Sequence, residues 1–589
     1  MAGARPFAHH IPSMGYSEEY ELQTQCGICG FEIEGGKDNC VPLKKSSKTP
    51  PILLNPSYTL PVNRHHRVWN AARWFNIQSR SERYGPKLMI AHADCFKLFL
   101  KECTCEDRLE RLFTLGNWVQ PWATVLTLYL DPSTDVTRGI SLVADVYNMP
   151  GIKSMPLEVA NLIQEYSRSH IIWRFASALD RLDKLTKAGV DQLDLVPLRQ
   201  VALWERGSLP TLSSNLRGEA IRLAIDSYGL AKIERMALRP KSTTFSSKTS
   251  AYVVEHQKDC KQITVDFKFG LAHLNLSPQG SGLKIWDRPC PPNMLGCYGF
   301  RNAVTPPIHH ITTIEPRTCT GITFWYRTHI DHLHAHTVSK PDPQETWRNY
   351  TYPSHNAMWF YLPLPPGEEI LAFGVREPIV NDEDDYRPLS YVFWTALSGQ
   401  ITIGRHPYSE TQDTVLATGP DLTLVHTRSL LHDNNFFGTH SAKRRQFKFD
   451  TYTPKTTPSF RRDFFSWAPL ENITRVQVFI YNELKVSRKT CRGMIFHYAD
   501  GSQRALGQCR LFKDIFVSHV NPSSICLAAV QVSTKNRTHE QTRVDFSCSE
   551  HRKEDDETEW RCFPMRGVLE FWYCHHEWTI NVVVNGHTT

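Results

Sequence analysis

In the second half of the chain, apolar and aromatic residues alternate with polar ones, and turn-forming residues interrupt the pattern at short intervals. A period of two sends successive side chains to opposite faces of a strand, so the pattern predicts β-structure from about residue 311 to Thr589. Strands must pair and bury one face, which constrains the fold more than any other feature here. We expect a multidomain α+β fold with a large β-rich C-terminal region of β-prism or sandwich type.

Two parts of this region resemble each other. Glu368–Val375 aligns with Glu471–Val478, and at the same offset of 103 positions Tyr391–Thr395 aligns with Met494–Tyr498. One ungapped offset that links two strand-like stretches indicates duplicated β-modules. The alternative is chance similarity, because amphipathic strands share a period of two whatever their origin.

Local composition and hydrophobic periodicity change along the chain, and together with its length they predict the domain organisation. A chain of 589 residues with 41% hydrophobic residues has room for several domains, each with its own core. The expected domains are a Cys/His head (1–125), an F-box-like helical segment (150–206), a mixed strand and loop domain (215–310) and two related β-rich modules (311–465 and 466–589).

Charge and hydropathy exclude some classes of function. The net charge of +7 is small for this length, so no nucleic-acid partner is expected. No run approaches 18 apolar residues, and the first residues lack the apolar core of a secretory signal, so we expect no membrane association and a cytoplasmic or nuclear location. In that setting the sixteen cysteines should be mostly reduced thiols or metal ligands.

Cysteine and histidine pairs stand out in the head. Cys26 and Cys29 flank a two-residue turn in CGICG, and His92 and Cys95 have the same spacing in HADC. Each pair can direct two ligands to one side of a tight turn, and three thiolates with one imidazole suit tetrahedral zinc. The spacing therefore predicts a structural zinc site with these four ligands.

Other assignments remain open in the head. Cys40, Cys103 and Cys105 are competing ligands. Alternatively, the first cysteine pair consists of free thiols and the histidine caps the helix predicted after it. Gly27 and Gly30 are expected to ease a left-handed backbone in the first turn.

Helical periodicity is strongest between Gly151 and Leu182. Ser154 is a good N-cap type, and Pro156 suits a first helical turn, where backbone N–H groups lack partners. Helices this short are not stable alone, so their apolar faces must pack on something. The first face comprises Val159, Leu162, Ile163 and Tyr166, and the second Ile172, Phe175, Leu179 and Leu182.

This segment resembles the F-box, the helical module that docks on Skp1 in ubiquitin-ligase complexes. The matching residues are Met155–Val159, Ile163, Tyr166 and the stretch from Trp173 to Leu179. The closing helix of that module is not recognisable, and Val196–Gly207 is only a loose substitute. The resemblance implies a Skp1-like partner contacted by Pro156, Leu157, Val159, Ile163, Tyr166 and Trp173.

More broadly, the chain is similar to fungal F-box-like proteins that combine a cysteine-bearing head with a long β-rich region. That similarity includes Ile221–Met236 and the turn GLKIWDRPCPP that begins at Gly282. The F-box-like pattern between Pro156 and Leu182 leads us to expect a non-enzymatic adaptor that binds Skp1 and a target protein.

The stretch Arg327–His336 carries two alternative interpretations. His329, Asp331 and His332 resemble the H-x-H-x-D-H motif of metallo-β-lactamase-like hydrolases, although Arg327 replaces its first histidine. Alternatively, the histidines at 332, 334 and 336 lie on one face of a strand, where imidazoles can bind a metal. The acidic runs Asn381–Tyr386 and Glu554–Glu559 lack the spacing of a calcium loop.

The β-modules weakly resemble jacalin-type β-prism lectins, because the strand Ile473–Val478 precedes a Gly493–Gly501 segment as in those proteins. The resemblance implies carbohydrate binding as an alternative function. Aromatic side chains can stack on sugars, but they also fill β-sheet cores. The aromatic candidates are Trp394, Tyr498, Trp572, Tyr573 and Trp578.

Overall fold

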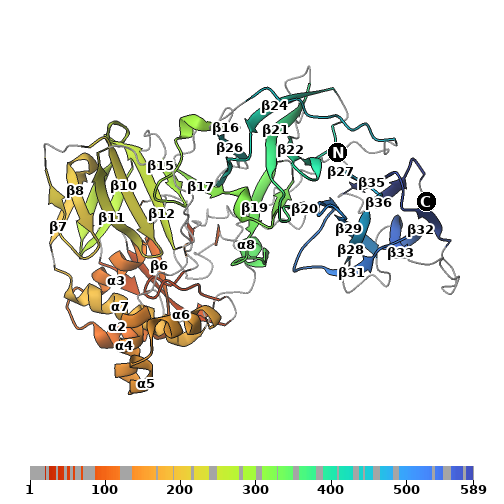
Figure 1. Ribbon diagram of the computed structural model, residues 1–589. Helices are drawn as coiled ribbons and strands as arrows, with labels where there is room; N and C mark the ends of the chain where they lie inside the picture. The colour runs from red at the N-terminus through yellow and green to blue at the C-terminus, as the bar shows by residue number, and fades with distance from the viewer. Residues whose placement is uncertain are drawn as a thin grey trace, which may run out of the picture. The chain divides into compact units, whose positions relative to one another are not determined.

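The computed structural model describes residues 20–587 except for 22–24, 35–36, 46–49, 54–57, 60–67, 70–86, 120–121, 123–129, 131–135, 168–169, 190, 214–217, 238–248, 277–282, 300–307, 328, 349–356, 380–388, 408–409, 429–436, 442–444, 456–463, 482–489, 534–537, 548–558 and 575–578. Among these residues the chain is mostly β-sheet, in several open sheets (Figure 1). The chain divides into two compact units. The first holds the described residues of 1–238, 248–251 and 255–280, and the second those of 252–254 and 281–589.

The first unit begins with a small antiparallel sheet and two helices. Strand β2 pairs with β3, β4 and β6, and β6 leads directly into helix α2. The bounds are β1 Tyr20–Glu21, β2 Asn39–Lys45, β3 Ile52–Leu53, β4 Tyr58–Thr59, β5 Val68–Trp69, β6 Lys87–His92, α2 Ala93–Glu102 and α3 Arg108–Asn117.

Four further helices follow, as the periodicity predicts for part of this region. They are α4 Val136–Tyr147, α5 Pro150–Lys153, α6 Leu157–Tyr166 and α7 Ile171–Lys187. Pro156, and not Ser154, occupies the N-cap of α6, because Ser154 ends the short helix α5. No described helix is both long and apolar enough to cross a membrane.

Strands complete the first unit. The segment from Val196 to Gly207 is not helical: it ends β7, forms one 3₁₀ turn and continues as β8, which pairs with β11. Two antiparallel sheets result, in the orders β9-β8-β11-β10 and β14-β13-β7. The bounds are β7 Gln192–Pro197, η1 Leu198–Gln200, β8 Val201–Glu205, β9 Thr211–Leu212, β10 Ala220–Asp226, β11 Gly229–Met236, β12 Ser250–His256, η2 Gln257–Cys260, β13 Thr264–Lys268 and β14 Leu271–Asn275. Residues 252–254, in the middle of β12, belong to the second unit.

The second unit contains a run of sheets in which an early strand pairs with later ones. Strand β17 pairs with β25, which pairs with β26, while β18 to β24 form two sheets between them. The bounds are β15 Leu283–Trp286, η3 Met294–Gly296, β16 Cys297–Tyr298, β17 Ile308–Ile314, η4 Pro316–Thr318, β18 Gly321–Tyr326, β19 Ile330–His336, α8 Gln344–Arg348, β20 Met358–Pro363, β21 Ile370–Pro378, β22 Ser390–Thr395, β23 Gly399–Ile403, β24 Thr411–Thr418, β25 Leu422–Arg428 and β26 Phe437–Ser441.

The end of the chain follows the same plan. Strand β27 pairs with β35, which pairs with β36, and β28 to β34 form two sheets between them. The bounds are β27 Phe464–Pro469, β28 Ile473–Tyr481, β29 Thr490–Tyr498, β30 Gln503–Gly507, β31 Ile515–Val520, β32 Ser524–Ser533, β33 Thr538–Ser547, β34 Arg561–Pro564, β35 Val568–Cys574 and β36 Thr579–Val584.

The two aligned sequence segments form sheets of the same order. One sheet runs β23-β22-β21-β24 and the other β30-β29-β28-β31. Phe373 pairs with Phe393 in the first, and the residues aligned with them, Val476 and Phe496, pair in the second. Strand order and register therefore agree at the offset that the sequence shows.

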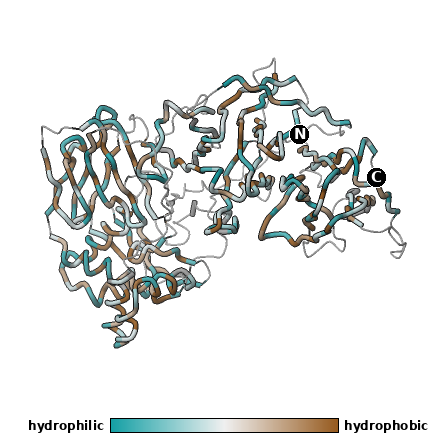
Figure 2. The backbone as a smooth tube through the Cα atoms, viewed as in Figure 1, coloured by the Kyte–Doolittle hydropathy of each residue, from teal (hydrophilic) through white to brown (hydrophobic). Residues whose placement is uncertain are grey.

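A large apolar core lies inside the second unit. It gathers side chains from nearly every strand between Ile314 and Val584, as expected where hydrophobic and hydrophilic residues alternate along strands (Figure 2). Trp572 and Tyr573 are buried, and the Tyr498 hydroxyl donates to the carbonyl of Pro469. These aromatic residues therefore serve mainly to fill or brace the sheets.

Some predicted features lie outside the described residues. They are the acidic run Asn381–Tyr386, nearly all of Glu554–Glu559, and Trp578. Among the described cysteines, Cys526 and Cys562 face each other across β32 and β34 and form a disulfide, while twelve others are free thiols.

Candidate metal centre

Four side chains from the head converge on one point. The ligand atoms of Cys26, Cys29, His92 and Cys95 all lie within 4.8 Å of one another, and all four residues are buried. These are the residues that the spacing predicts. Within the described parts of the chain, no other group of three or more Cys, His, Asp or Glu side chains is arranged to hold a metal ion.

A tight turn supplies the first pair of sulfurs. The Cys26 amide donates to the carbonyl of Phe31 (2.8 Å), and the Gly30 amide donates to the carbonyl of Cys26 (2.8 Å). Gly30 has a φ of +77°, so it does ease a left-handed backbone. Gly27 does not: a Cβ there would lie 2.6 Å from Met89 and 2.8 Å from Gly116, so its role is close packing.

The second pair comes from the junction between β6 and α2. His92 occupies the N-cap position of α2, but its side chain makes no capping hydrogen bond. The ring instead faces the sulfurs, with Nδ1 3.4 Å from Cys29 Sγ and 3.8 Å from Cys95 Sγ. Because Cys95 follows within the first turn of α2, the helix fixes its thiol beside the imidazole.

The electrostatics of the cluster fit a cation. Burial raises the pKa of the Cys29 thiol well above its usual value, and the hydrogen bond with Cys26 raises it further. Burial also acts to raise the pKa of Cys26, but hydrogen bonds with Cys29, Cys95 and His92 lower it well below its usual value. Several buried thiolates repel each other unless a cation is shared between them, and three sulfurs with one imidazole nitrogen are donors of the kind that structural zinc binds.

Side chains of helix α7 donate hydrogen bonds to the turn that carries Cys26 and Cys29. Arg181 donates to the carbonyl oxygens of Gly27 (3.1 Å) and Ile28 (2.8 Å), and Ser177 donates to that of Cys29 (2.7 Å). Tyr228 supports both side chains of α7, because its hydroxyl lies 2.6 Å from Ser177 Oγ and its ring lies 4.2 Å from the Arg181 guanidinium. Helix α7 therefore satisfies three successive buried carbonyls of the turn.

Asp38 connects His92 to the same helix. Its carboxylate lies 3.5 Å from His92 Nε2 and accepts a hydrogen bond from Arg174 of α7 (3.1 Å). The distance to His92 is within ion-pair range, but His92 Nε2 forms no hydrogen bond with the carboxylate. Sequence spacing did not indicate Asp38, Arg174, Ser177 or Arg181, because their partners are far away in the chain.

The competing cysteines lie outside the cluster. Cys103 and Cys105 lie 3.1 Å apart, sulfur to sulfur, and contact each other. Cys40 pairs with His92 across β2 and β6, and burial raises its pKa to about 12. None of the three belongs to the group of ligands.

Two histidines of strand β19 form hydrogen bonds with neighbouring residues. His336 contacts Thr323 Oγ1 and the Pro341 carbonyl at 2.7 Å each, and His334 Nδ1 lies 2.8 Å from Thr346 Oγ1. Asp331 forms an ion pair with Arg327 and lies 3.3 Å from His329 Nε2.

The residues predicted to contact a partner divide into two sets. Trp173 is buried against Ile140 and Ala160, and its indole donates to Ser167 Oγ (2.9 Å). The others lie at the surface together with Leu162: they are Pro156, Leu157, Val159, Ile163 and Tyr166. The structure therefore leaves the predicted apolar stripe of α6 uncovered.

No known protein family, curated protein or solved structure matches this chain.

Proposed function

We propose that this protein is an adaptor that docks a Skp1-like partner through helix α6 and presents its β-rich region to a target protein. The main support is the exposure of the α6 stripe. The stripe consists of Val159, Leu162, Ile163 and Tyr166, which are 41% to 88% exposed, and the helix packs through Ala160 on another side. Leu157, in the first turn of the helix, is 50% exposed.

An exposed stripe of this kind favours a partner. Single apolar side chains at a surface are ordinary, but four on one face of a ten-residue helix concentrate hydrophobic area where a partner can bury it. Anchors spaced along one helical face are typical of helix-mediated docking. The resemblance of the same residues to the F-box points to a Skp1-like partner.

The metal centre gives this surface a rigid base. We propose that it holds structural zinc, with Cys26, Cys29, His92 and Cys95 as ligands and no open position for a substrate. Helix α7 contacts the first ligand turn through Arg181 and packs on α6 through Trp173. Zinc would therefore stabilise the platform on which α6 rests.

The β-modules provide the second surface of the adaptor. Their equal strand order and register support an origin by duplication. Duplicated sheets offer similar edges and loops at two places along the chain, which suits the presentation of a target protein.

The test is co-purification of the full-length protein with Skp1. A variant with Leu157→Ala, Ile163→Ala and Tyr166→Ala should lose at least tenfold in affinity, because a total loss of about 1.4 kcal/mol over the three side chains is enough for a tenfold change. Equal recovery of Skp1 with this variant and with the unchanged protein would reject the proposed role.

A matched control separates docking from general surface hydrophobicity. Leu203, Leu209 and Leu212 are also exposed leucines of the first unit, outside α6. Their triple replacement by alanine removes a similar apolar area and should leave Skp1 recovery unchanged. Equal loss in both variants would show that capture is non-specific.

A further inference from the structure

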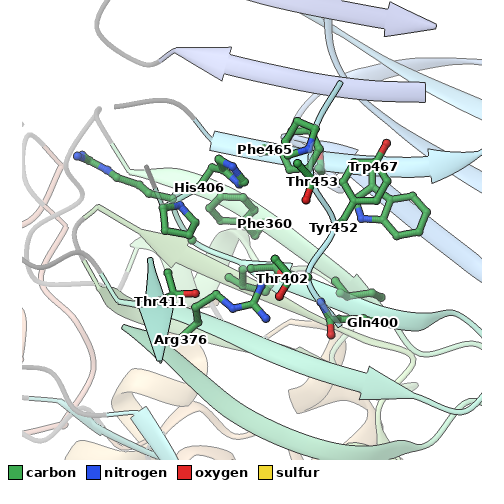
Figure 3. Close-up of a pocket in the computed structure, with 18 of the residues that line it drawn as sticks. Phe360, Arg376, Gln400, Thr402, His406, Thr411, Tyr452, Thr453, Phe465 and Trp467 are labelled. Atoms are coloured by element: carbon green, nitrogen blue, oxygen red, sulfur yellow. The ribbon is translucent and has the colours of Figure 1, made fainter. Parts of the chain in front are cut away.

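A pocket of about 470 Å³ lies within the second unit, and no sequence motif points to it. It is lined by β23 and β24 of one module, by β27 and β30 of the other, and by the segment 451–454 between them. Its volume falls within the range of small-molecule sites. Figure 3 shows Tyr452, Phe465 and Trp467 together on one side of it and Thr402 and Thr411 across from them.

Stacked aromatic rings form one wall. The rings of Tyr452 and Trp467 lie 4.5 Å apart and 15° from parallel, and the Tyr452 and Phe465 rings lie 5.7 Å apart and 22° from parallel. All three residues line the pocket, and their side chains are only half-buried. Phe360 adds a further apolar lining. Such a wall favours a ligand with an apolar face.

The buried arginines of the pocket are already compensated by the protein. Arg376 donates to both carboxylate oxygens of Asp413 (2.7 and 2.8 Å). Arg504 donates to the carbonyls of Trp467, Ser398 and Gln400, and its guanidinium lies 4.4 Å from the Trp467 ring. Neither arginine therefore needs an acidic ligand.

The other ionisable side chains also favour an uncharged ligand. Burial, with a contribution from Arg376, lowers the pKa of His406 to about 4, so this imidazole is neutral near pH 7. Two further charged side chains line the pocket, Arg405 and Glu410, and they have opposite signs.

Hydroxyl groups remain for recognition. Thr402, Thr411, Thr451 and Thr453 line the pocket, and their hydroxyls form no hydrogen bond within the described part of the chain. Each hydroxyl can donate one hydrogen bond and accept two. Together with the aromatic wall, they match a ligand that has many hydroxyl groups and an apolar C–H face.

We propose that this pocket binds an uncharged carbohydrate of about disaccharide size. The sugar would place its C–H face against the wall formed by Tyr452, Phe465 and Trp467. Its hydroxyls would exchange hydrogen bonds with Thr402 and Thr411 on the opposite side. This site is separate from α6 and from the metal centre, so its test is independent of Skp1 binding.

The test is saturation-transfer NMR of the full-length protein with a panel of neutral disaccharides, followed by titration of the best binder. The double variant Thr402→Val/Thr411→Val keeps the side-chain shape and should weaken binding about tenfold, through the loss of two hydrogen bonds. Phe465→Ala should weaken it as well. Thr264→Val is the matched control, because Thr264 lies on strand β13, outside the pocket, and this variant should bind normally.

Acidic disaccharides of equal size form the second arm of the experiment. A neutral sugar should bind as well at high salt as at low salt, because no ion pair is involved. The proposal is overturned if no neutral disaccharide binds, if the threonine double variant binds normally, or if only acidic sugars bind and salt abolishes their binding.

Discussion

The guanidinium of Arg181 donates a hydrogen bond to the carbonyl oxygen of Ile28, at a distance of 2.8 Å, from 153 residues further along the chain. Arg181 belongs to α7, and Ile28 lies between the two cysteines of the first metal-ligand pair. The helical segment therefore does more than expose α6. Its second helix closes the metal centre, and one structural unit combines the two features that the sequence shows separately.

Metal content is the first prediction. Purified full-length protein should carry about one zinc ion per chain at this site, and Cys26→Ser should remove it, because three ligands hold the ion much less tightly than four. Elemental analysis measures the ratio. Cys105→Ser is the control, since Cys105 lies outside the cluster, and it should keep the metal. An equal zinc content in the two variants would contradict the assignment.

The hydrogen bonds from Arg181 to the turn between Cys26 and Cys29 give the second prediction. Arg181→Ala leaves the buried carbonyls of Gly27 and Ile28 without their donor. It should lower the free energy of unfolding by about 2–3 kcal/mol, which is typical for lost hydrogen bonds to a charged group.

Denaturant unfolding of the zinc-loaded protein measures this loss. Arg199→Ala replaces an exposed arginine of the same unit and should change stability by less than about 0.5 kcal/mol. If both variants change the free energy of unfolding equally little, the hydrogen bonds from Arg181 add no stability.

Local spacing explains what the sequence could predict. A ligand pair in a tight turn, or at a strand–helix junction, depends on residues three apart, so Cys26 with Cys29 and His92 with Cys95 were visible in the sequence. The two pairs are separated by 62 residues, and side chains from distant parts of the chain complete the site, so local spacing does not indicate these contacts. Arg181, for example, looks like an ordinary charged position of an amphipathic helix.

The helical periodicity shows the same limit. It correctly predicts one apolar stripe on α6, but a period of 3.6 residues does not show which face a protein buries. Ala160, which is too small to stand out, carries the packing against Trp173, while Leu162 and Tyr166 lie at the surface. The sequence does not indicate the pocket in the second unit for a related reason: its lining residues come from strands of two modules that are far apart in the chain.

The contrast between Leu162 and Trp173 yields the third prediction. Leu162→Glu should change the free energy of unfolding by less than about 0.5 kcal/mol, because the side chain is exposed. Trp173→Ala should cost about 3–5 kcal/mol, because it leaves a cavity against Ile140 and Ala160. Urea unfolding of both variants checks this difference. A strongly destabilised Leu162→Glu protein would mean that the α6 stripe is covered by the chain itself.

The pH dependence of stability is the fourth prediction, and it centres on His406. Burial and the nearby Arg376 lower the pKa of this imidazole in the folded protein to about 4, whereas in the unfolded chain it is about 6.5. The unfolded state therefore binds the proton more tightly. The contribution of His406 to stability is fully present above pH 6.5 and is lost as the pH falls from about 6.5 to 4.

With allowance for the partial exposure of the ring, the loss should amount to about 2 kcal/mol. Urea unfolding at pH 7.5 and pH 4.5 measures it for the unchanged protein and for His406→Gln, which cannot titrate. The variant should lose less stability between the two pH values than the unchanged protein does. If both lose the same amount, His406 is not held neutral by its surroundings, and the charge balance inferred for the pocket is wrong.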